Sequence, residues 1–215
     1  MKLRDYSKEI EQYRKLIPAT LRLITDKLNE RLEDMTFTQG ITLETYGETT
    51  QKTKLLSHMF PGATARAAKA LGIDWEYVDA TGYDHVLNEI TKVEDKTSLG
   101  DDDSKFAVGN NHSKAKNCLH LVQKFKVSGN EFTDIFAALV DVPKLQHPNS
   151  GWDDKVTETG NNNNGFSSLF VHPTDLCHVY PIFGDTRKYR LGTKNITPQT
   201  KTLKTAYTVY ESCIY

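Results

Sequence analysis

The sequence has little cysteine and no metal-binding pattern built on histidine or cysteine. Among its 215 residues there are three cysteines, Cys118, Cys177 and Cys213, which are odd in number and widely spaced. This pattern gives neither a disulfide framework nor a zinc knuckle. The histidines also lack the spacing of zinc ligands.

A long apolar run and an excess of charge of one sign are absent as well. The longest apolar runs are too short to span a bilayer, and the opening text "MKLRDYSKEIEQYRK" is charged, unlike a signal peptide. We therefore expect a protein of the cytoplasm with no membrane partner. Lys and Arg number 27 against 28 Asp and Glu. This balance counts against a protein that coats nucleic acid indiscriminately, but it leaves room for a basic groove that acids elsewhere balance.

What is present is the composition of an ordinary globular domain, with 38% hydrophobic and 26% charged residues. Apolar residues recur at helical spacing over 5–35, and we expect a helix there that is interrupted near Pro18. Residues 36–56 have weak strand or loop character. A second helix is predicted over 61–71, with Pro61 near its start and Gly72 as its stop signal.

After this helix the apolar period changes to two, which is typical of strands. A hairpin is predicted around Asn88 and Glu89, and a second one around the turn at 128–130. The predicted strands are 83–90, 92–98, 118–127, 132–142, 166–173 and 177–184, with long polar loops at 101–114 and 143–165. With no internal repeat and no linker, we expect a single α/β domain over 1–215, with a central mixed β-sheet flanked by helices.

The stretch "TGYDHVLNEITKVEDKTS" (81–98) concentrates charge in the first predicted hairpin. Because alternate residues of a strand share a face, Glu94 and Lys96 point the same way and Asp95 points to the opposite face. The hairpin can bring Asp84 beside Glu94 and Lys96. Two carboxylates at this separation form an oxygen site for Mg²⁺, and a lysine beside them can stabilise charge on a phosphate or position a water.

Chance and a solvated surface are the alternatives to a metal site at this hairpin. The acid-x-Lys pattern occurs three times, at Glu94, Asp103 and Asp153, and only the first lies on a predicted strand with an acid opening its hairpin partner. Asp84, Glu94 and Lys96 can otherwise be charges of a solvated hairpin face. If the face that receives Asp95 is covered, Asp95 needs a hydrogen-bond partner or solvent.

The text "GYDHVLN…KVEDKTS" resembles the core of the PD-(D/E)XK nuclease superfamily, and specifically type II restriction endonucleases. The resemblance covers about residues 60–142. It implies a restriction-endonuclease-like fold, Asp84 and Glu94 as Mg²⁺ ligands, and Lys96 as the catalytic lysine. It further implies sequence-specific cleavage of double-stranded DNA to 5′-phosphate ends, usually by a homodimer, since two-fold symmetry suits palindromic sites.

Several other residues are candidates for the same activity. An additional acid from upstream would be one of five: Glu30, Glu33, Glu44, Glu48 and Glu76. Gln123 and Lys124 either reach the DNA phosphates or line a solvent-exposed edge of the sheet. Hydrogen-bond donors to DNA are expected in the polar loops, including 146–165. These residues either contact DNA or form solvated surface. The residues concerned are Lys105, Asn110, Asn111, His112, Lys114, Lys116, Arg187, Lys188 and Arg190.

Two rival functions stay open at this point. A DNA repair or recombination nuclease of the same fold would recognise structure or damage instead of a sequence. A non-enzymatic DNA-binding protein would use the helix around 61–74, because "ATARAAKALGID" resembles the first helix and turn of a helix-turn-helix. No recognition helix is predicted after it.

Overall fold

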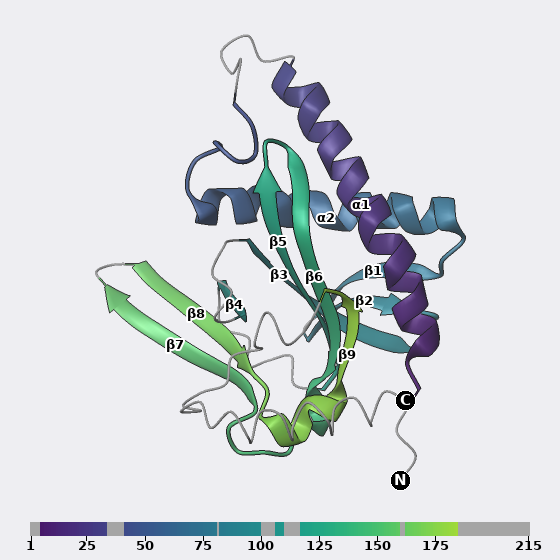
Figure 1. Cartoon of the computed structure of the whole chain (residues 1–215), viewed down its shortest axis with the longest axis vertical. Coiled ribbons are helices and arrows are strands. Elements are labelled where there is room, and N and C mark those ends of the chain that lie inside the picture. Colours follow the sequence, from purple (N-terminus) through teal and green to yellow (C-terminus); the bar gives the residue numbers. More distant parts are fainter. Residues whose placement is uncertain are drawn as a thin grey trace.

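The computed structural model describes residues 5–33, 41–80, 82–99, 106–109, 117–159 and 162–184. This part of the chain forms two long helices, two short 3₁₀ helices and nine strands (Figure 1). The helices are α1 (Ser7–Glu33), α2 (Thr49–Leu71), η1 (Val142–Lys144) and η2 (Pro173–His178). The strands are β1 (Trp75–Ala80), β2 (Tyr83–Leu87), β3 (Thr91–Leu99), β4 (Phe106–Gly109), β5 (Leu119–Ser128), β6 (Glu131–Asp141), β7 (Gly151–Thr159), β8 (Asn162–Phe170) and β9 (Val179–Phe183). Neither long helix is apolar over a stretch sufficient to cross a membrane.

Six strands form the central sheet in the order β1-β2-β3-β5-β6-β9, and a smaller sheet has the order β4-β8-β7. Neighbours in the central sheet are antiparallel except β3 and β5, which are parallel. The predicted α/β class with a mixed central sheet is therefore confirmed. A parallel pair requires a crossover of a dozen or more residues. The described part of the crossover from β3 to β5 is β4, which pairs with β8 of the smaller sheet.

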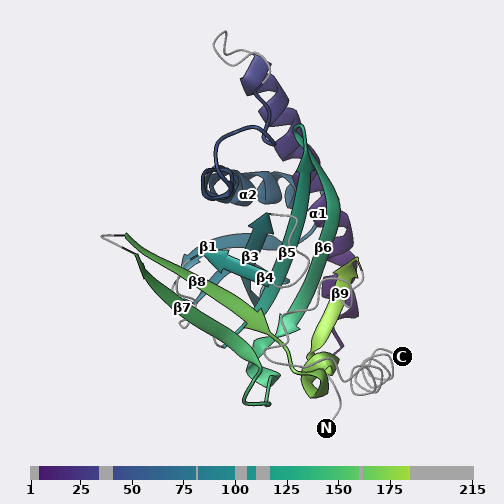
Figure 2. The ribbon, with the colours of Figure 1, turned by 60° about the vertical axis from the view of Figure 1, so that its left-hand side comes forward.

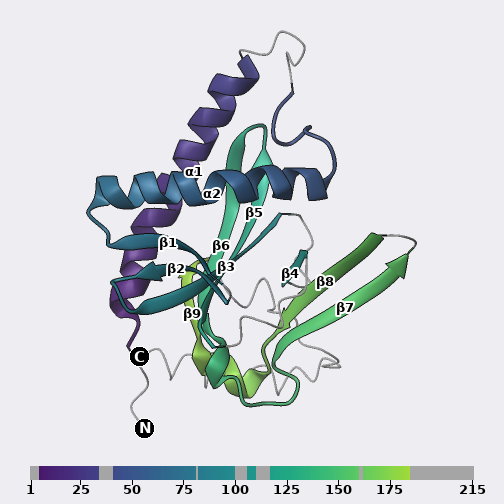
Figure 3. The ribbon, with the colours of Figure 1, turned by 180° about the vertical axis from the view of Figure 1, so that it is seen from behind.

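Both long helices pack on one face of the central sheet. Leu16 and Leu21 of α1 and Ala68 of α2 belong to one buried cluster with Leu121 of β5 and Leu139 of β6. Figure 3 shows α2 crossing α1, and the two helices contact each other. The face covered by α1 and α2 is called the helix face below.

The opposite face of the central sheet is covered in part by the smaller sheet. Val122 of β5 and Ala138 of β6 pack there against Leu169 of β8 and against Val171 and Val179. Figure 2 shows β7 and β8 running side by side, with β4 between them and the central sheet. The face that meets the smaller sheet is called the open face below, and it is the face that carries the candidate site.

The two helices differ from the prediction in their continuity and length. Pro18 lies inside an unbroken α1, because the buried side chains around it, Leu16, Ile17 and Leu21, hold the helix by tertiary packing despite one missing backbone donor. Helix α2 begins at Thr49, not near Pro61, so the strand or loop character expected for 49–56 is wrong. A capping box, in which Glu48 and Gln51 exchange hydrogen bonds with each other's backbone, starts α2 early.

The hairpins at 83–98 and 118–142 are confirmed, with strand ends that differ from the prediction by at most three residues, whereas two predicted loops contain strands. The loop predicted over 143–165 holds all of β7 and the start of β8, and the loop over 101–114 holds β4. Strand β1 follows α2 where no strand was expected. These strands carry Asn and charged residues that have low intrinsic strand preference, and their pairing with partner strands decides their conformation instead.

Phe125 is a test of the packing between α2 and the sheet. Its side chain is fully buried, stacks on Phe60 of α2 with ring centroids 5.9 Å apart, and meets the edge of Phe132 at 5.5 Å. We expect Phe125→Ala to lower the free energy of unfolding by about 3–5 kcal/mol, measured by denaturant titration. The matched control is Ile90→Ala, since Ile90 is 74% exposed and its truncation should leave stability within about 0.5 kcal/mol.

Candidate active site

Strands β2 and β3 bring Asp84, Glu94 and Lys96 to the open face. Asp84 is the second residue of β2, and the β2–β3 register pairs its neighbour His85 with Val93. Asp84 and Glu94 therefore stand on the same face of adjacent strands, and Lys96 follows two residues along β3. The structure thus brings together the three residues that the sequence predicted for this site.

Glu94 and Lys96 are both largely buried, at 8% and 7% exposure. The Nζ of Lys96 donates a hydrogen bond to Oε1 of Glu94, and the two form an ion pair. Burying charges in this way is costly unless they are paired, and removing one partner leaves the other uncompensated. The burial argues against a merely solvated hairpin face, the alternative left open above.

Asp84 is held by the backbone of the opposite strand. Its Oδ2 accepts a hydrogen bond from the backbone N–H of Asp95 at 2.7 Å. Burial raises the pKa of Asp84 to about 6, and the negative charges of Asp95 and Glu94 add to the rise, while Lys96 and the Asp95 N–H oppose it. Asp84 therefore lies close enough to Glu94 and Lys96 to feel both charges.

The donor set fits a hard divalent cation. Asp84 and Glu94 supply carboxylate oxygens on one face, and the pKa of Asp84 is raised by burial first and then by the charges of Asp95 and Glu94, which Lys96 only partly opposes. Mg²⁺ uses one or two protein carboxylates and keeps several waters. No group of three or more His, Cys, Asp or Glu that could hold a metal occurs among the described residues. The set that fits Mg²⁺ here is the pair of carboxylates.

Asp95 points to the helix face, as the alternation predicts, and it has a partner there. Its Oδ2 lies 3.1 Å from Nδ1 of His85, an ion-pair distance, although the alignment falls short of a direct hydrogen bond. The other ring nitrogen of His85, Nε2, is 2.6 Å from the hydroxyl of Tyr13 on α1. The prediction was a hydrogen-bond partner or solvent, and the structure gives Asp95 an ion-pair contact with His85 and a side chain that is 35% exposed. The sequence did not identify His85 or Tyr13 as that partner.

The start of β7 meets the central sheet beside Glu94. Strand β3 pairs Glu94 with His120 of β5, and the indole Nε1 of Trp152 on β7 donates a hydrogen bond to Nδ1 of His120 at 3.0 Å. Cys118, just before β5, donates from its Sγ to the carbonyl of Gly82 at 3.2 Å. Burial and the charge of Glu94 raise the pKa of Cys118 to about 12, so it stays a thiol and is not a nucleophile at neutral pH.

Most of the upstream acids have other partners. Glu30 pairs with Lys27, Glu44 accepts from the backbone N–H of Gly129, and Glu48 caps α2. The side chain of Glu33 lies outside the described residues. Glu76 of β1 pairs with Val86 in register and is the candidate on the open face.

Gln123 and Lys124, which the sequence offered together as phosphate contacts, point in opposite directions. Gln123 lines a cavity on the helix face with Leu121. Lys124 follows His120 and Val122 along β5 on the open face and is 5% exposed. Of the two, only Lys124 shares the face of Asp84, Glu94 and Lys96.

The predicted DNA contacts fall mostly beyond the residues described. Lys105, Asn110, Asn111, His112, Lys114, Lys116, Arg187, Lys188 and Arg190 all lie outside the described residues. The predicted 146–165 loop is largely the β7–β8 hairpin. The helix around 61–74 is the second half of α2; its Ala67 and Ala68 are buried in the core and β1 follows it, which is not a helix-turn-helix.

Comparison of the chain with models of known protein families and with curated proteins finds no match.

The raised pKa of Asp84 makes a prediction about stability and pH. The unfolded chain releases the proton of Asp84 near pH 3.8, whereas the folded protein keeps it to about pH 6. The folded state therefore binds more protons between these values, and the stabilisation present below pH 3.8 is lost as the pH rises to about 6. Asp84→Asn removes this pH-dependent loss of stability. Without metal, the variant should therefore have a higher melting temperature than wild type at pH 7.5, and no higher one at pH 3.5.

Thermal melts of both proteins across this pH range, in the presence of a chelator, measure the difference. Asp134→Asn is the control, because Asp134 is half-exposed at the far end of β6, beside Lys126. A difference between wild type and Asp84→Asn that does not change with pH would contradict the assigned pKa.

Proposed function

We propose that the protein is a Mg²⁺-dependent endonuclease that cleaves double-stranded DNA at a specific sequence, in the manner of a type II restriction enzyme. The observation that carries the proposal is the meeting of Asp84, Glu94 and Lys96 on one face of the β2–β3 hairpin, with the Glu94–Lys96 ion pair buried. The resemblance of the same hairpin to the PD-(D/E)XK nuclease core supports it. A restriction-endonuclease-like fold is part of the proposal.

Each residue of the site has a distinct role in this proposal. Asp84 and Glu94 would hold Mg²⁺, which when bound polarises a phosphate oxygen and lowers the pKa of a bound water. Lys96 would place its ammonium beside the phosphate and stabilise the charge that develops there. The Asp95 N–H holds Asp84 in place through its 2.7 Å hydrogen bond, so that the ligand is oriented before metal and substrate arrive.

A homodimer belongs to the same proposal. Two copies related by a two-fold axis would place one site on each strand of a palindromic sequence, and the products would carry 5′-phosphates. Cleavage directed by damage or DNA structure is the nearest alternative on the same fold.

The deciding experiment is incubation of purified protein with unmethylated plasmid DNA and Mg²⁺, followed by mapping of the fragment ends. Discrete bands with 5′-phosphate ends at one sequence support the proposal. Cleavage only at mismatches, flaps or junctions would point to a repair nuclease instead. Duplex binding without cleavage in any divalent metal would leave a DNA-binding protein and overturn the enzymatic assignment.

Glu94 tests the metal-binding role. Glu94→Gln keeps the size of the side chain and removes the charge that the cation needs, so cleavage should be lost while a folded protein remains. Circular dichroism and a thermal melt check the fold, which matters because Glu94 is buried against Lys96. Cleavage by Glu94→Gln at a rate near that of wild type would remove Glu94 from the site.

Lys96 is expected to act in the chemical step. Lys96→Met keeps the aliphatic stem, and the rate at saturating DNA should fall at least ~10²-fold, as for one positioned catalytic group, with little change in DNA affinity measured in Ca²⁺. Lys92→Met is the matched control, since Lys92 lies on the same strand and face, is exposed, and sits over the ring of Tyr83. It should cleave normally. A variant Lys96→Met that binds DNA poorly yet cleaves normally at saturation would make Lys96 a phosphate anchor.

A further inference from the structure

Helix α1 contacts the β2–β3 hairpin at several polar points. At the turn of the hairpin the amides of Gln12 and Asn88 exchange two hydrogen bonds, each 2.9 Å long. At the start of β3 the hydroxyl of Thr91 donates to Oε1 of Glu9 at 3.2 Å. These contacts fix the hairpin against the first half of α1, on the side opposite to the candidate metal ligands.

The contact closest to the site runs through His85, which is fully buried on the helix face. The Tyr13 hydroxyl lies 2.6 Å from its Nε2, and Asp95 Oδ2 lies 3.1 Å from its Nδ1. Burial, reinforced by the charges of Asp95 and Glu9, raises the pKa of Tyr13 well above its usual value, so Tyr13 keeps its proton. With Tyr13 donating to Nε2, the ring proton belongs on Nδ1, facing Asp95.

Asp95 connects this buried chain of groups to the open face. Its side chain faces His85, while its own backbone N–H donates to Oδ2 of Asp84 on the other side of the sheet. Any rotation of the peptide at Asp95 changes the direction of that N–H and hence the position of the Asp84 carboxylate. Tyr13, His85 and Asp95 are thus linked to Asp84 through this hydrogen bond, in addition to the peptide bond between Asp84 and His85.

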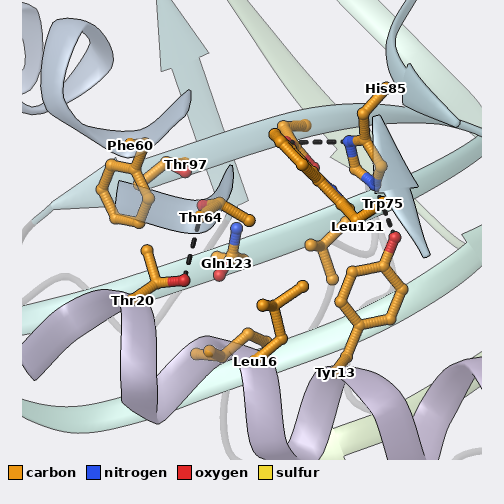
Figure 4. Close-up of a pocket in the computed structure, with 12 residues that line it drawn as sticks. Tyr13, Leu16, Thr20, Phe60, Thr64, Trp75, His85, Thr97, Leu121 and Gln123 are labelled. Atoms are coloured by element: carbon orange, nitrogen blue, oxygen red, sulfur yellow. Dashed lines mark hydrogen bonds and ion pairs between the residues drawn. The ribbon is translucent and has the colours of Figure 1, made fainter. Parts of the chain in front are cut away.

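A small cavity of about 40 Å³ lies beside this chain of groups, between α1, α2 and the sheet (Figure 4). Figure 4 shows the Tyr13 hydroxyl reaching His85 at one side of it and Thr20 bonded to Thr64 at the other. Three buried polar atoms of its lining, Nε1 of Trp75, Nδ1 of His85 and Oδ1 of Asp95, have no hydrogen-bond partner within the described chain. A space of this size and polarity accommodates ordered water, which would complete the hydrogen bonds of Asp95.

We propose that Tyr13 and His85 are positioning residues. Through their contacts with Asp95 on the helix face they fix the Asp95 peptide, whose N–H orients Asp84 for the metal. The inference rests on the proposed function, because it assigns Asp84 as a metal ligand. Neither residue touches the metal or the DNA. Groups that orient a metal ligand typically change metal affinity or activity by about 10–100-fold when removed.

The test measures metal binding without DNA as well as cleavage. Mn²⁺ is the probe, because carboxylate sites that take Mg²⁺ also take Mn²⁺ and the free ion is detected by electron paramagnetic resonance. We expect Tyr13→Phe and His85→Leu to weaken Mn²⁺ binding about 10–100-fold. In cleavage assays the Mg²⁺ concentration for half-maximal rate should rise, and the rate at saturating Mg²⁺ should largely recover.

Two further variants separate positioning from packing. Thr20→Val removes a hydroxyl from the same cavity and the same helix without touching His85 or Asp95, so its Mn²⁺ affinity should equal that of wild type. His85→Asn keeps an N–H near the place of Nδ1, and it should bind Mn²⁺ better than His85→Leu does. All measurements are made well below the melting temperature of each variant, so that loss of folded protein does not contribute.

Each outcome decides the proposal. Wild-type affinity for Mn²⁺ in both Tyr13→Phe and His85→Leu, whatever their melting temperatures, overturns it. Equal weakening by Thr20→Val also overturns it, since loosened packing then explains the effect. If wild type binds Mn²⁺ but cleaves no DNA, the nuclease function fails while the Mn²⁺ affinities still decide the roles of Tyr13 and His85. Absence of Mn²⁺ binding by wild type contradicts both proposals.

Discussion

The alternation of side chains along β3 is the constraint on which the rest of the site depends. This strand carries three consecutive charged residues. Because side chains alternate with a period of two, Glu94 and Lys96 lie on the open face and Asp95 lies on the helix face. A slip of one residue would exchange the two faces and place an acid and a lysine against the hydrophobic core under α1. The parallel pairing with β5 and the antiparallel pairing with β2 fix this register from both sides.

Each face of β3 compensates its charge by different means. On the helix face, Asp95 lies against the buried His85, whose other ring nitrogen contacts Tyr13 of α1. Oδ1 of Asp95 and Nδ1 of His85, at the small cavity, have no hydrogen-bond partner in the described chain. On the open face Lys96 pairs with Glu94, while burial, with the negative charges of Asp95 and Glu94 adding to it, raises the pKa of Asp84 to about 6. Ionisation of the buried Asp84 carboxyl therefore destabilises the metal-free protein at neutral pH, and a cation bound only by the folded state would offset that loss of stability. In the proposed function, the buried carboxylates would thus bind the cation at the expense of the stability of the metal-free protein.

The parts of the fold and site that the sequence could predict are those set by local rules. Asp84, Glu94 and Lys96 were predicted correctly as neighbours, because a short hairpin and strand alternation determine their arrangement without reference to the rest of the chain. The early start of α2 was missed, although Glu48 and Gln51 form a readable capping signal, since the surrounding Thr and Gly favour a loop. The link from His85 to Tyr13 spans 72 positions and depends on how α1 docks on the sheet. No local pattern identifies such a pair.

The charged middle residue of the acid-x-Lys motif was the one local sign of that link. A carboxylate at position 95 on a covered face requires a hydrogen-bond partner or solvent, so its presence indicates a polar neighbour or water behind the strand without saying which. The structure supplies His85 from the adjacent strand, one residue after Asp84, which stands opposite Glu94, and it supplies Tyr13 from α1. A residue that disturbs the apolar pattern of a strand beside a candidate site is thus informative in itself. Here it connects the packing of α1 to the orientation of Asp84 through a single backbone N–H.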